Sequence, residues 1–137
     1  MAYWLFKTEP EAWSWEQQQK KGAKGELWSG VRNHQAANNL KAMKKGDLGF
    51  FYHSGEERRI VGIVEVIGEY RPDPTDASGR FGLVDVKAVK DVPAPVTLAA
   101  IKAEPRLADT VLVKNSRLSV QPVKKEEWKL IAKMGGL

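Results

Sequence analysis

The segment from Arg59 to Tyr70 is the feature that most limits how this chain can fold. Its apolar side chains occupy both alternating sets of strand positions: Val61, Ile63 and Ile67 on one parity, and Ile60, Val64 and Val66 on the other. Because successive side chains of a strand point to opposite faces, a strand with this pattern is buried on both faces. It predicts either a strand of a closed barrel with helices outside, or the central strand of a sheet. Gly62 and Gly68 indicate bulges or barrel corners within it.

The other strands are predicted from shorter apolar or alternating runs, which cover residues 3–8, 47–53, 82–90 and 117–120. Pro93 and Pro95 are expected to end the third of these runs, because proline has no N–H to donate to a strand ladder. Residues 71–79 are rich in Pro, Asp and Gly and predict a mobile, turn-rich loop. Residues 106–113 remain ambiguous between a short helix and a short strand.

Capping residues locate the helices, which are predicted over residues 14–21, 33–45, 97–101 and from 123 to the glycines at 135 and 136. Ser14 and Gln17 form a capping box, and Asn33 caps the second helix. Trp128 and Ile131 of the closing helix are expected to dock on the sheet. Few helices and no regular βαβ alternation favour a single α+β domain over residues 1–137, built on a small barrel.

Composition limits the classes of function that fit this chain. The 137 residues include no cysteine and two histidines, which excludes disulfides and thiolate metal sites, and we expect neither a metal nor a cofactor. Membrane-spanning and signal-peptide patterns are absent, so we expect a monomeric, cytoplasmic protein without membrane contacts. A net charge of +5 favours a polyanionic partner, although basic residues this dispersed fit a solvated surface equally well.

Residues 28–40 predict a loop that leads into the first turn of a helix. Gly30 permits a tight backbone, and the N–H groups at a helix start favour an anion or an acceptor-rich ring. Trp28 offers a stacking face and Arg32 a fork of donors, which together predict a nucleobase or nucleotide site. The alternative is that Trp28 simply packs in the core. Trp13 and Trp15 are expected to be lid or core aromatics without a chemical role.

The sequence does not favour an enzyme. It contains no phosphate-binding glycine loop, nucleophile elbow or zinc-protease motif. Asp47 and His53 are six residues apart on one strand, roughly 20 Å by strand rise, and so cannot hydrogen-bond to each other. Tyr52 and Ser54 share one face of that strand, while His53 lies on the other. These side chains are either satisfied polar groups in the core or, with Lys7 and Thr8, the lining of a pocket beneath Trp28.

Four segments in order along the chain resemble the EVE domain family. They are Tyr-Trp-Leu-Phe-Lys-Thr-Glu-Pro at 3–10, Trp-Ser-Gly-Val-Arg-Asn at 28–33, Phe-Phe-Tyr-His-Ser at 50–54 and Arg-Leu-Ser-Val-Gln-Pro at 117–122. The resemblance implies a PUA-like fold, a small β pseudo-barrel flanked by short helices, and kinship with YTH domains, which hold a methylated adenine in an aromatic cage. It also implies a non-enzymatic reader of modified bases. Ala37 and Phe81 depart from the family pattern, which often has Arg and Trp there.

Matching these motifs to the chain gives two groups of candidate residues. The base pocket is assigned to Lys7, Thr8, Trp28, Ser29, Asn33, Tyr52, His53 and Ser54. Contacts to phosphates are assigned to Arg32, Lys41, Lys44 and Arg117. The resulting hypothesis is capture of a modified base, cytosine or adenine, in DNA or RNA. Two alternatives stay open: a general RNA-binding module that grips the backbone, and an adaptor domain that binds a protein or a small metabolite.

Overall fold

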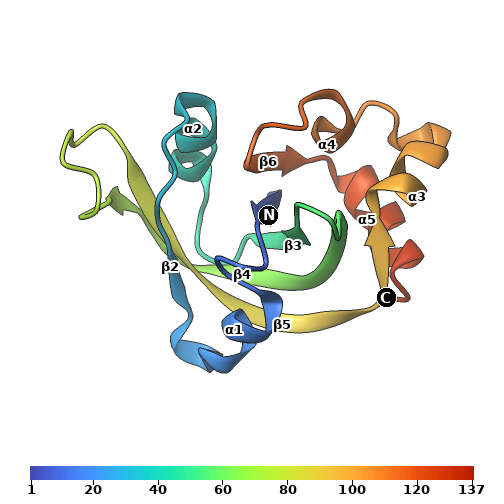
Figure 1. The fold of residues 1–137 in the computed structure, drawn as a ribbon, viewed down its shortest axis with the longest axis horizontal. Coiled ribbons are helices and arrows are strands. Elements are labelled where there is room, and N and C mark those ends of the chain that lie inside the picture. Colours follow the sequence, from blue (N-terminus) through green and yellow to red (C-terminus); the bar gives the residue numbers. More distant parts are fainter.

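The computed structural model describes residues 1–137 as one curved mixed sheet with short helices around it (Figure 1). The strands are β1 Tyr3–Thr8, β2 Glu26–Trp28, β3 Leu48–His53, β4 Arg59–Pro72, β5 Gly82–Thr97 and β6 Val120–Val123, in the order β2-β5-β4-β3-β1-β6. The short edge strands β2 and β6 do not pair with each other, so the sheet stays open. The predicted α+β, PUA-like class is confirmed, but the barrel does not close.

Strand β4 is the central strand that its two apolar faces predicted. It pairs antiparallel with β3 on one side and with β5 on the other. The β4–β5 register shifts next to both Gly62 and Gly68, so the bulges expected at these glycines are present. A Cβ on Gly62 would lie 2.2 Å from the Trp15 ring, which shows why glycine stands there.

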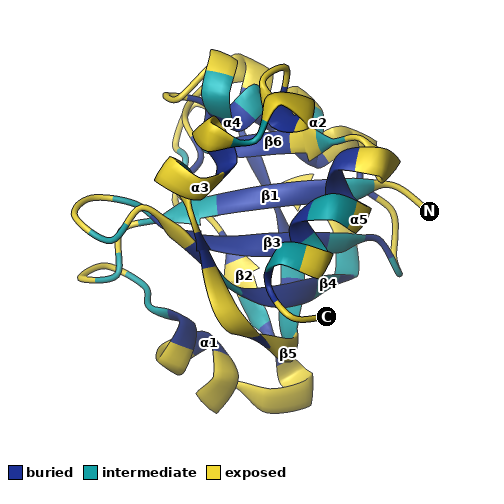
Figure 2. Cartoon of the chain, turned by 90° about the vertical axis from the view of Figure 1, so that its right-hand side faces the viewer, coloured by how far each residue is buried: buried dark blue, intermediate teal, exposed yellow.

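The helices are α1 Trp15–Lys20, α2 His34–Ala42, α3 Leu98–Ala103, α4 Val111–Lys114 and α5 Lys125–Met134, with 3₁₀ turns at Gly22–Lys24 and Pro105–Leu107. They cover two apolar cores, one on each side of the sheet. The first core packs α1 and α2 over Phe6, Phe51 and Trp28, and the second packs α3–α5 over Phe50 and Tyr52. In Figure 2, β1 and β3 are buried over most of their length, and α5 lies in front of them. Trp128 stacks on Phe50 with ring centroids 3.8 Å apart, as the predicted docking of the last helix requires.

Strand β2 was not predicted, and β4 runs two residues further than predicted, to Pro72. The two larger differences in strand boundaries both involve proline at an edge. Strand β5 continues through Pro93 and Pro95 to Thr97, because beyond Val86 it is paired on the β4 side only and its ladder skips from Asp91 to Val96. Strand β6 begins at Val120 and includes Pro122, which pairs with Trp4 at the edge of the sheet. The ambiguous residues 106–113 form a 3₁₀ turn and part of α4. None of the helices is both long and apolar enough to span a bilayer.

Candidate functional site

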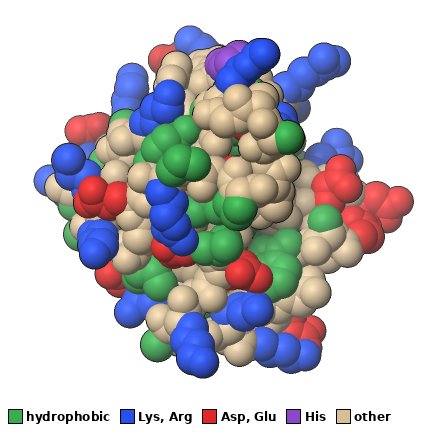
Figure 3. All heavy atoms as spheres, turned by 90° about the vertical axis from the view of Figure 1, so that its left-hand side faces the viewer, with side chains coloured by type: hydrophobic (Ala, Val, Ile, Leu, Met, Phe, Trp, Pro, Cys, Tyr) green, Lys and Arg blue, Asp and Glu red, His purple; other side chains and the backbone are tan.

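The main candidate site is a cavity of about 560 Å³, which we call the β1–β2 cavity. It lies where the C-terminal ends of β1 and β2 meet the loop before α2. Figure 3 shows the face of the molecule that carries β2, on which Lys and Arg side chains surround apolar patches. Its lining consists of Lys7, Thr8, Ala12, Trp13, Glu26, Leu27, Trp28, Ser29, Gly30, Val31, Arg32 and Ser119. It thus unites the first two motifs found in the sequence.

Trp28 forms the floor of the cavity, and most of its ring belongs to the core. The side chain is only 8% exposed. It meets Phe6 and Phe51 edge to face, with ring centroids 5.1 and 5.8 Å apart. Of the two interpretations left open by the sequence, core packing accounts for most of the surface of this residue, while its remaining surface lines the cavity.

Trp13 is a cavity residue that sequence reasoning missed. It is half-buried; its indole N–H donates to Gln18 Oε1 at 2.9 Å, and its carbonyl accepts from the Thr8 hydroxyl at 3.1 Å. An apolar residue directly before a helix N-cap usually packs on its own helix, so the local pattern at Ser14 predicted packing. Only the position of β1 beside this turn places the ring at the cavity. Trp15 is a core residue as expected, with its indole N–H bonded to Asp91 at 2.7 Å.

The polar side chains of the lining differ in whether they already have hydrogen-bond partners within the chain. The Lys7 ammonium donates to the Ser116 carbonyl and lies 5.6 Å from the centre of the Tyr52 ring, and burial lowers the pKa of this lysine. The Thr8 hydroxyl is bonded to the turn at Trp13. The Ser29 side chain is exposed at the rim and free to bind a ligand. Lys7 and Ser29 therefore supply donors beside an aromatic floor.

One wall of the cavity is held by a buried carboxylate in the loop after β4. Asp73 Oδ2 accepts from the Gly30 N–H at 2.9 Å and from Arg32 at 3.2 Å, and Oδ1 accepts from the Thr75 N–H at 2.7 Å. Burial alone would raise the pKa of Asp73, but these bonds and that from the Thr75 hydroxyl hold it well below its usual range. The loop at 71–79, expected to be mobile, is therefore anchored, and Arg32 is already ion-paired.

Two of the N–H groups around Asn33 are already hydrogen-bonded within the chain. The Gly30 N–H is bonded to Asp73, and the Ala36 N–H is bonded to the Asn33 side chain at 2.9 Å. Asn33 caps α2 as predicted but does not line the cavity. A capping side chain satisfies one N–H group of the helix start from within the chain, which leaves fewer donors for a ligand than the hypothesis required.

The third motif lies beneath the cavity, outside its lining. Tyr52 is 2% exposed in the second core, and Ser54 donates its N–H to the Thr8 carbonyl at 2.8 Å. His53 Nε2 accepts from the Trp15 N–H at 2.9 Å, and Nδ1 lies 2.9 Å from Glu57, whose pKa this contact lowers. His53 is therefore a hydrogen-bonded polar group in the core, whereas Tyr52 packs its ring there and Ser54 is partly buried at the end of the strand.

The residues assigned to phosphate contacts are spread over the surface. Arg32 lines the cavity, whereas Lys41 lies on α2 with its ammonium 5.5 Å from the centre of the Tyr70 ring. Lys44 and Arg117 are exposed and lie outside the lining. No group of three or more acidic, histidine or cysteine side chains is arranged to hold a metal ion. The structure thus gathers Lys7, Thr8, Trp28, Ser29 and Arg32 at one place, and disperses the remainder.

The chain is similar to known proteins over nearly its whole length. Thymocyte nuclear protein 1 of Gallus gallus is 34% identical to this chain over 94% of the chain, which spans 66% of that protein. The Homo sapiens protein is 31% identical over 95% of the chain, which spans 72% of that protein. The solved structure of a Rhodopseudomonas palustris protein is 64% identical, with a TM-score of 0.94 over 99% of this chain and 94% of that one.

Two further solved structures contain nucleic acid. The human THYN1 protein in complex with DNA containing 5-methylcytosine is 30% identical, with a TM-score of 0.92 over 100% of this chain and 99% of that one. The YTH domain of Zygosaccharomyces rouxii MRB1, in complex with N6-methyladenosine RNA, shares the fold, with 20% identity and a TM-score of 0.59 over 99% of this chain and 85% of that one. The EVE domain model matches residues 2–134, and this chain belongs to the EVE domain family.

Proposed function

We propose that this chain is a non-enzymatic nucleic-acid-binding domain that takes a modified base into the β1–β2 cavity. The observation that carries the proposal is the human THYN1 complex with 5-methylcytosine DNA, since that protein shares 30% identity and the whole fold with this chain. The cavity is of suitable size, because ligand sites usually enclose about 300–1,000 Å³. 5-Methylcytosine in DNA is therefore the first base to test, with other modified bases of DNA and RNA as alternatives.

The lining contains aromatic residues on which a base can stack and polar residues that can contact the edge of the base. Stacking of a base on an aromatic side chain contributes about 1–3 kcal/mol, and Trp13 and Trp28 are the aromatic residues of the lining. Burying one methyl group adds only about 0.8 kcal/mol, roughly fourfold in affinity. Stronger selectivity requires polar groups that the wrong base leaves unpaired, at about 1–3 kcal/mol each. Lys7 and Ser29 are the lining residues best placed for that role.

The proposal that the domain is not an enzyme rests on how its polar residues are used. Asp47 precedes β3 and accepts from the Trp4 indole N–H at 3.1 Å and the Lys44 N–H at 3.0 Å. His53 ends the same strand and is bonded to Trp15 and Glu57. No nucleophile is paired with a base at the cavity, so its geometry supports binding.

The test is fluorescence anisotropy with labelled oligonucleotides that differ at one base, plain or modified. The panel includes cytosine, 5-methylcytosine, adenine and N6-methyladenine in single- and double-stranded DNA, and the matching RNA strands. We expect at least tenfold preference for one modified base. Because extracting a base from a duplex costs a few kcal/mol, single strands should bind at least as well unless other contacts compensate.

Two variants of one residue separate base stacking from other binding. Trp13→Ala removes the aromatic face and should weaken binding by about 5- to 150-fold, which corresponds to 1–3 kcal/mol. Trp13→Phe keeps an aromatic face and should retain most of the preference for the modified base. Salt-sensitive binding that ignores both the modification and Trp13 would indicate a general RNA- or DNA-binding surface. Absence of binding at low salt would refute nucleic-acid recognition and favour the adaptor alternative.

A further inference from the structure

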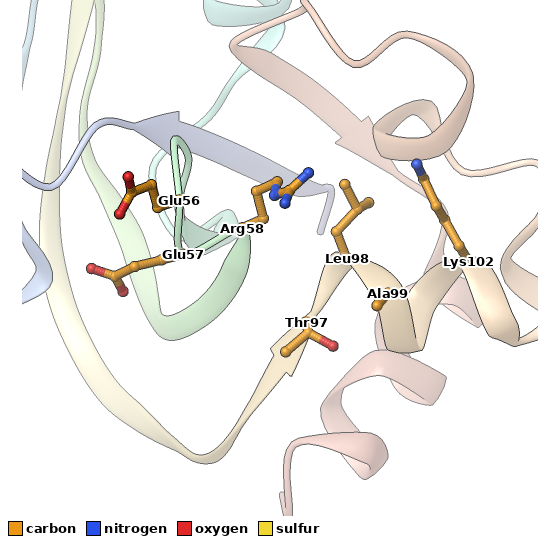
Figure 4. A pocket seen from close by; sticks show the side chains of 7 residues that line it. All are labelled: Glu56, Glu57, Arg58, Thr97, Leu98, Ala99 and Lys102. Carbon is orange, nitrogen blue, oxygen red and sulfur yellow. The ribbon is translucent and has the colours of Figure 1, made fainter.

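A second cavity, of about 370 Å³, lies between the β3–β4 turn and the junction of β5 with α3 (Figure 4). It is lined by Glu56, Glu57, Arg58, Thr97, Leu98, Ala99 and Lys102. In Figure 4 the charged ends of Arg58 and Lys102 lie on the same side, with Leu98 between them, while the two glutamate carboxylates lie beyond the turn. One side of this cavity is therefore cationic.

The two cations are free of acidic partners. The ion pairs of the chain include neither Arg58 nor Lys102, although Glu57 pairs with both His53 and Arg59. Both side chains are exposed. An exposed arginine and lysine on one side of a cavity, with the two glutamates on the other, are suited to an anion, and guanidinium matches the geometry of phosphate oxygens.

Arg58 also has an unusual backbone. It is the single non-glycine residue with positive φ, at +43°, and its carbonyl accepts from the Leu98 N–H at 2.8 Å. The left-handed region costs a residue with a Cβ about 1–2 kcal/mol, a cost that glycine avoids. The turn itself therefore favours glycine at this position. An arginine held there in spite of that cost points to a role for its side chain.

The cationic side adjoins the proposed base site through Tyr52. Strands β1 and β3 are parallel neighbours, with Lys7 opposite Tyr52, and the Lys7 ammonium is 5.6 Å from the Tyr52 ring centre. Arg58 acts on the same tyrosine: burial raises the pKa of the Tyr52 hydroxyl, and the charge of Arg58 opposes that rise. The turn that carries Arg58 also begins beside the end of β1, because the Ser54 N–H donates to the Thr8 carbonyl at 2.8 Å, so the two cavities lie near the same end of these strands.

We propose that Arg58 and Lys102 form a phosphate subsite that holds the backbone of the strand whose base enters the β1–β2 cavity. The ligand is a phosphodiester of the nucleic acid. This inference rests on the proposed function and extends it, because it assigns backbone contacts to residues other than Arg32, which is already paired with Asp73.

The test is the salt dependence of oligonucleotide binding by the full chain. Each phosphate contact contributes about 0.9 to the slope of log affinity against log salt for duplex DNA and about 0.7 for single strands. Arg58→Gly and Lys102→Gln should each lower the slope by about that amount. If a variant and the unmodified chain bind equally at 1 M salt, the variant should therefore bind roughly 5- to 8-fold more weakly at 0.1 M salt. The ratio of affinities for modified and plain bases should stay unchanged, since neither residue lines the base cavity.

Arg58→Gly is informative because it should not destabilise the fold. Glycine relieves the positive φ, so the midpoint of urea unfolding should equal or exceed that of the unmodified chain. The matched control is Lys45→Gln, which removes an exposed charge before β3, at the opposite end of that strand from Arg58. This control should retain the slope of the unmodified chain.

The outcomes separate this inference from the proposed function. A base preference that persists while Arg58→Gly and Lys102→Gln leave slope and affinity unchanged would overturn the subsite alone. A lowered slope without any base preference would support the subsite and overturn the reader. Saturation of the site by submillimolar inorganic phosphate, without any effect of the variants on oligonucleotide binding, would assign it to free phosphate and overturn a backbone contact.

Discussion

Replacing Asp73 should loosen the wall of the β1–β2 cavity, because this carboxylate joins the loop after β4 to the loop before α2. Its bonds to Thr75 are local, whereas those to Gly30 and Arg32 span 43 and 41 residues. A bond to a buried charged group contributes about 1.5–3 kcal/mol, and the pair with the partly exposed Arg32 at most about 1 kcal/mol. We therefore expect Asp73→Ala to lower the free energy of unfolding by about 2–4 kcal/mol, and Asp73→Asn by about half as much.

The assay combines urea unfolding, followed by tryptophan fluorescence, with hydrogen exchange of the Gly30 amide and anisotropy titration of the preferred oligonucleotide. The matched control is Asp76→Asn. Asp76 makes similar bonds to Ser78 and to the Phe81 N–H, all within its own loop. Asp73→Asn should speed exchange at Gly30 and weaken base binding, whereas Asp76→Asn should do neither. Equal effects of the two variants on Gly30 would refute the assignment of Asp73 as the anchor of this wall.

The same anchor predicts a pH dependence of stability. The pKa of Asp73 is lower in the folded chain than in the unfolded chain, where it is about 4. The contribution of this group is therefore complete above pH 4 and is lost as the pH falls below that value toward the folded pKa. Chemical unfolding between pH 2 and 6 should show a shallower loss of stability at acid pH for Asp73→Asn than for the unmodified chain. If Asp73→Asn loses stability at acid pH as steeply as the unmodified chain, another carboxylate must cause most of that loss.

Two further substitutions test how the fold supports the site. Gly62→Ala should lower the free energy of unfolding by about 1–3 kcal/mol in urea, because its Cβ would meet the Trp15 ring. A stability equal to that of the unmodified chain would show that the Trp15 ring can shift without cost. His53→Ala should cost a similar amount, about 1–3 kcal/mol, because it leaves the buried Trp15 N–H without its acceptor, and faster exchange of that amide would identify the cause.

Local signals predicted most of the elements, because caps and apolar periods act over a few residues. The capping box at Ser14, the cap at Asn33 and the cap at Thr97 are all present. The apolar residues on both faces of β4 correctly indicated a central strand. Pro93 misled the prediction of where β5 ends, because the effect of proline depends on whether its edge of the strand is paired, which the local sequence does not specify.

The candidate site was harder to predict, because it depends on contacts between distant segments. The motifs indicated Lys7, Thr8, Trp28 and Ser29, which the structure brings together. The anchoring role of Asp73 could not be predicted, since its loop has the composition of any exposed turn and its partners lie more than 40 residues away. Residues on β3 were assigned to the pocket because strand alternation defines two faces but not which of them is covered.

The burial of Trp28 decides how the site should be probed. Its ring packs against Phe6 and Phe51 in the first core, so Trp28→Ala would open a cavity there at a cost of about 3–5 kcal/mol. Loss of binding by that variant would report a damaged core as readily as a missing stacking partner. Trp13 lines the same cavity but is half-buried, and its indole is bonded only to Gln18. The comparison of Trp13→Ala with Trp13→Phe therefore tests base stacking while the aromatic floor stays intact.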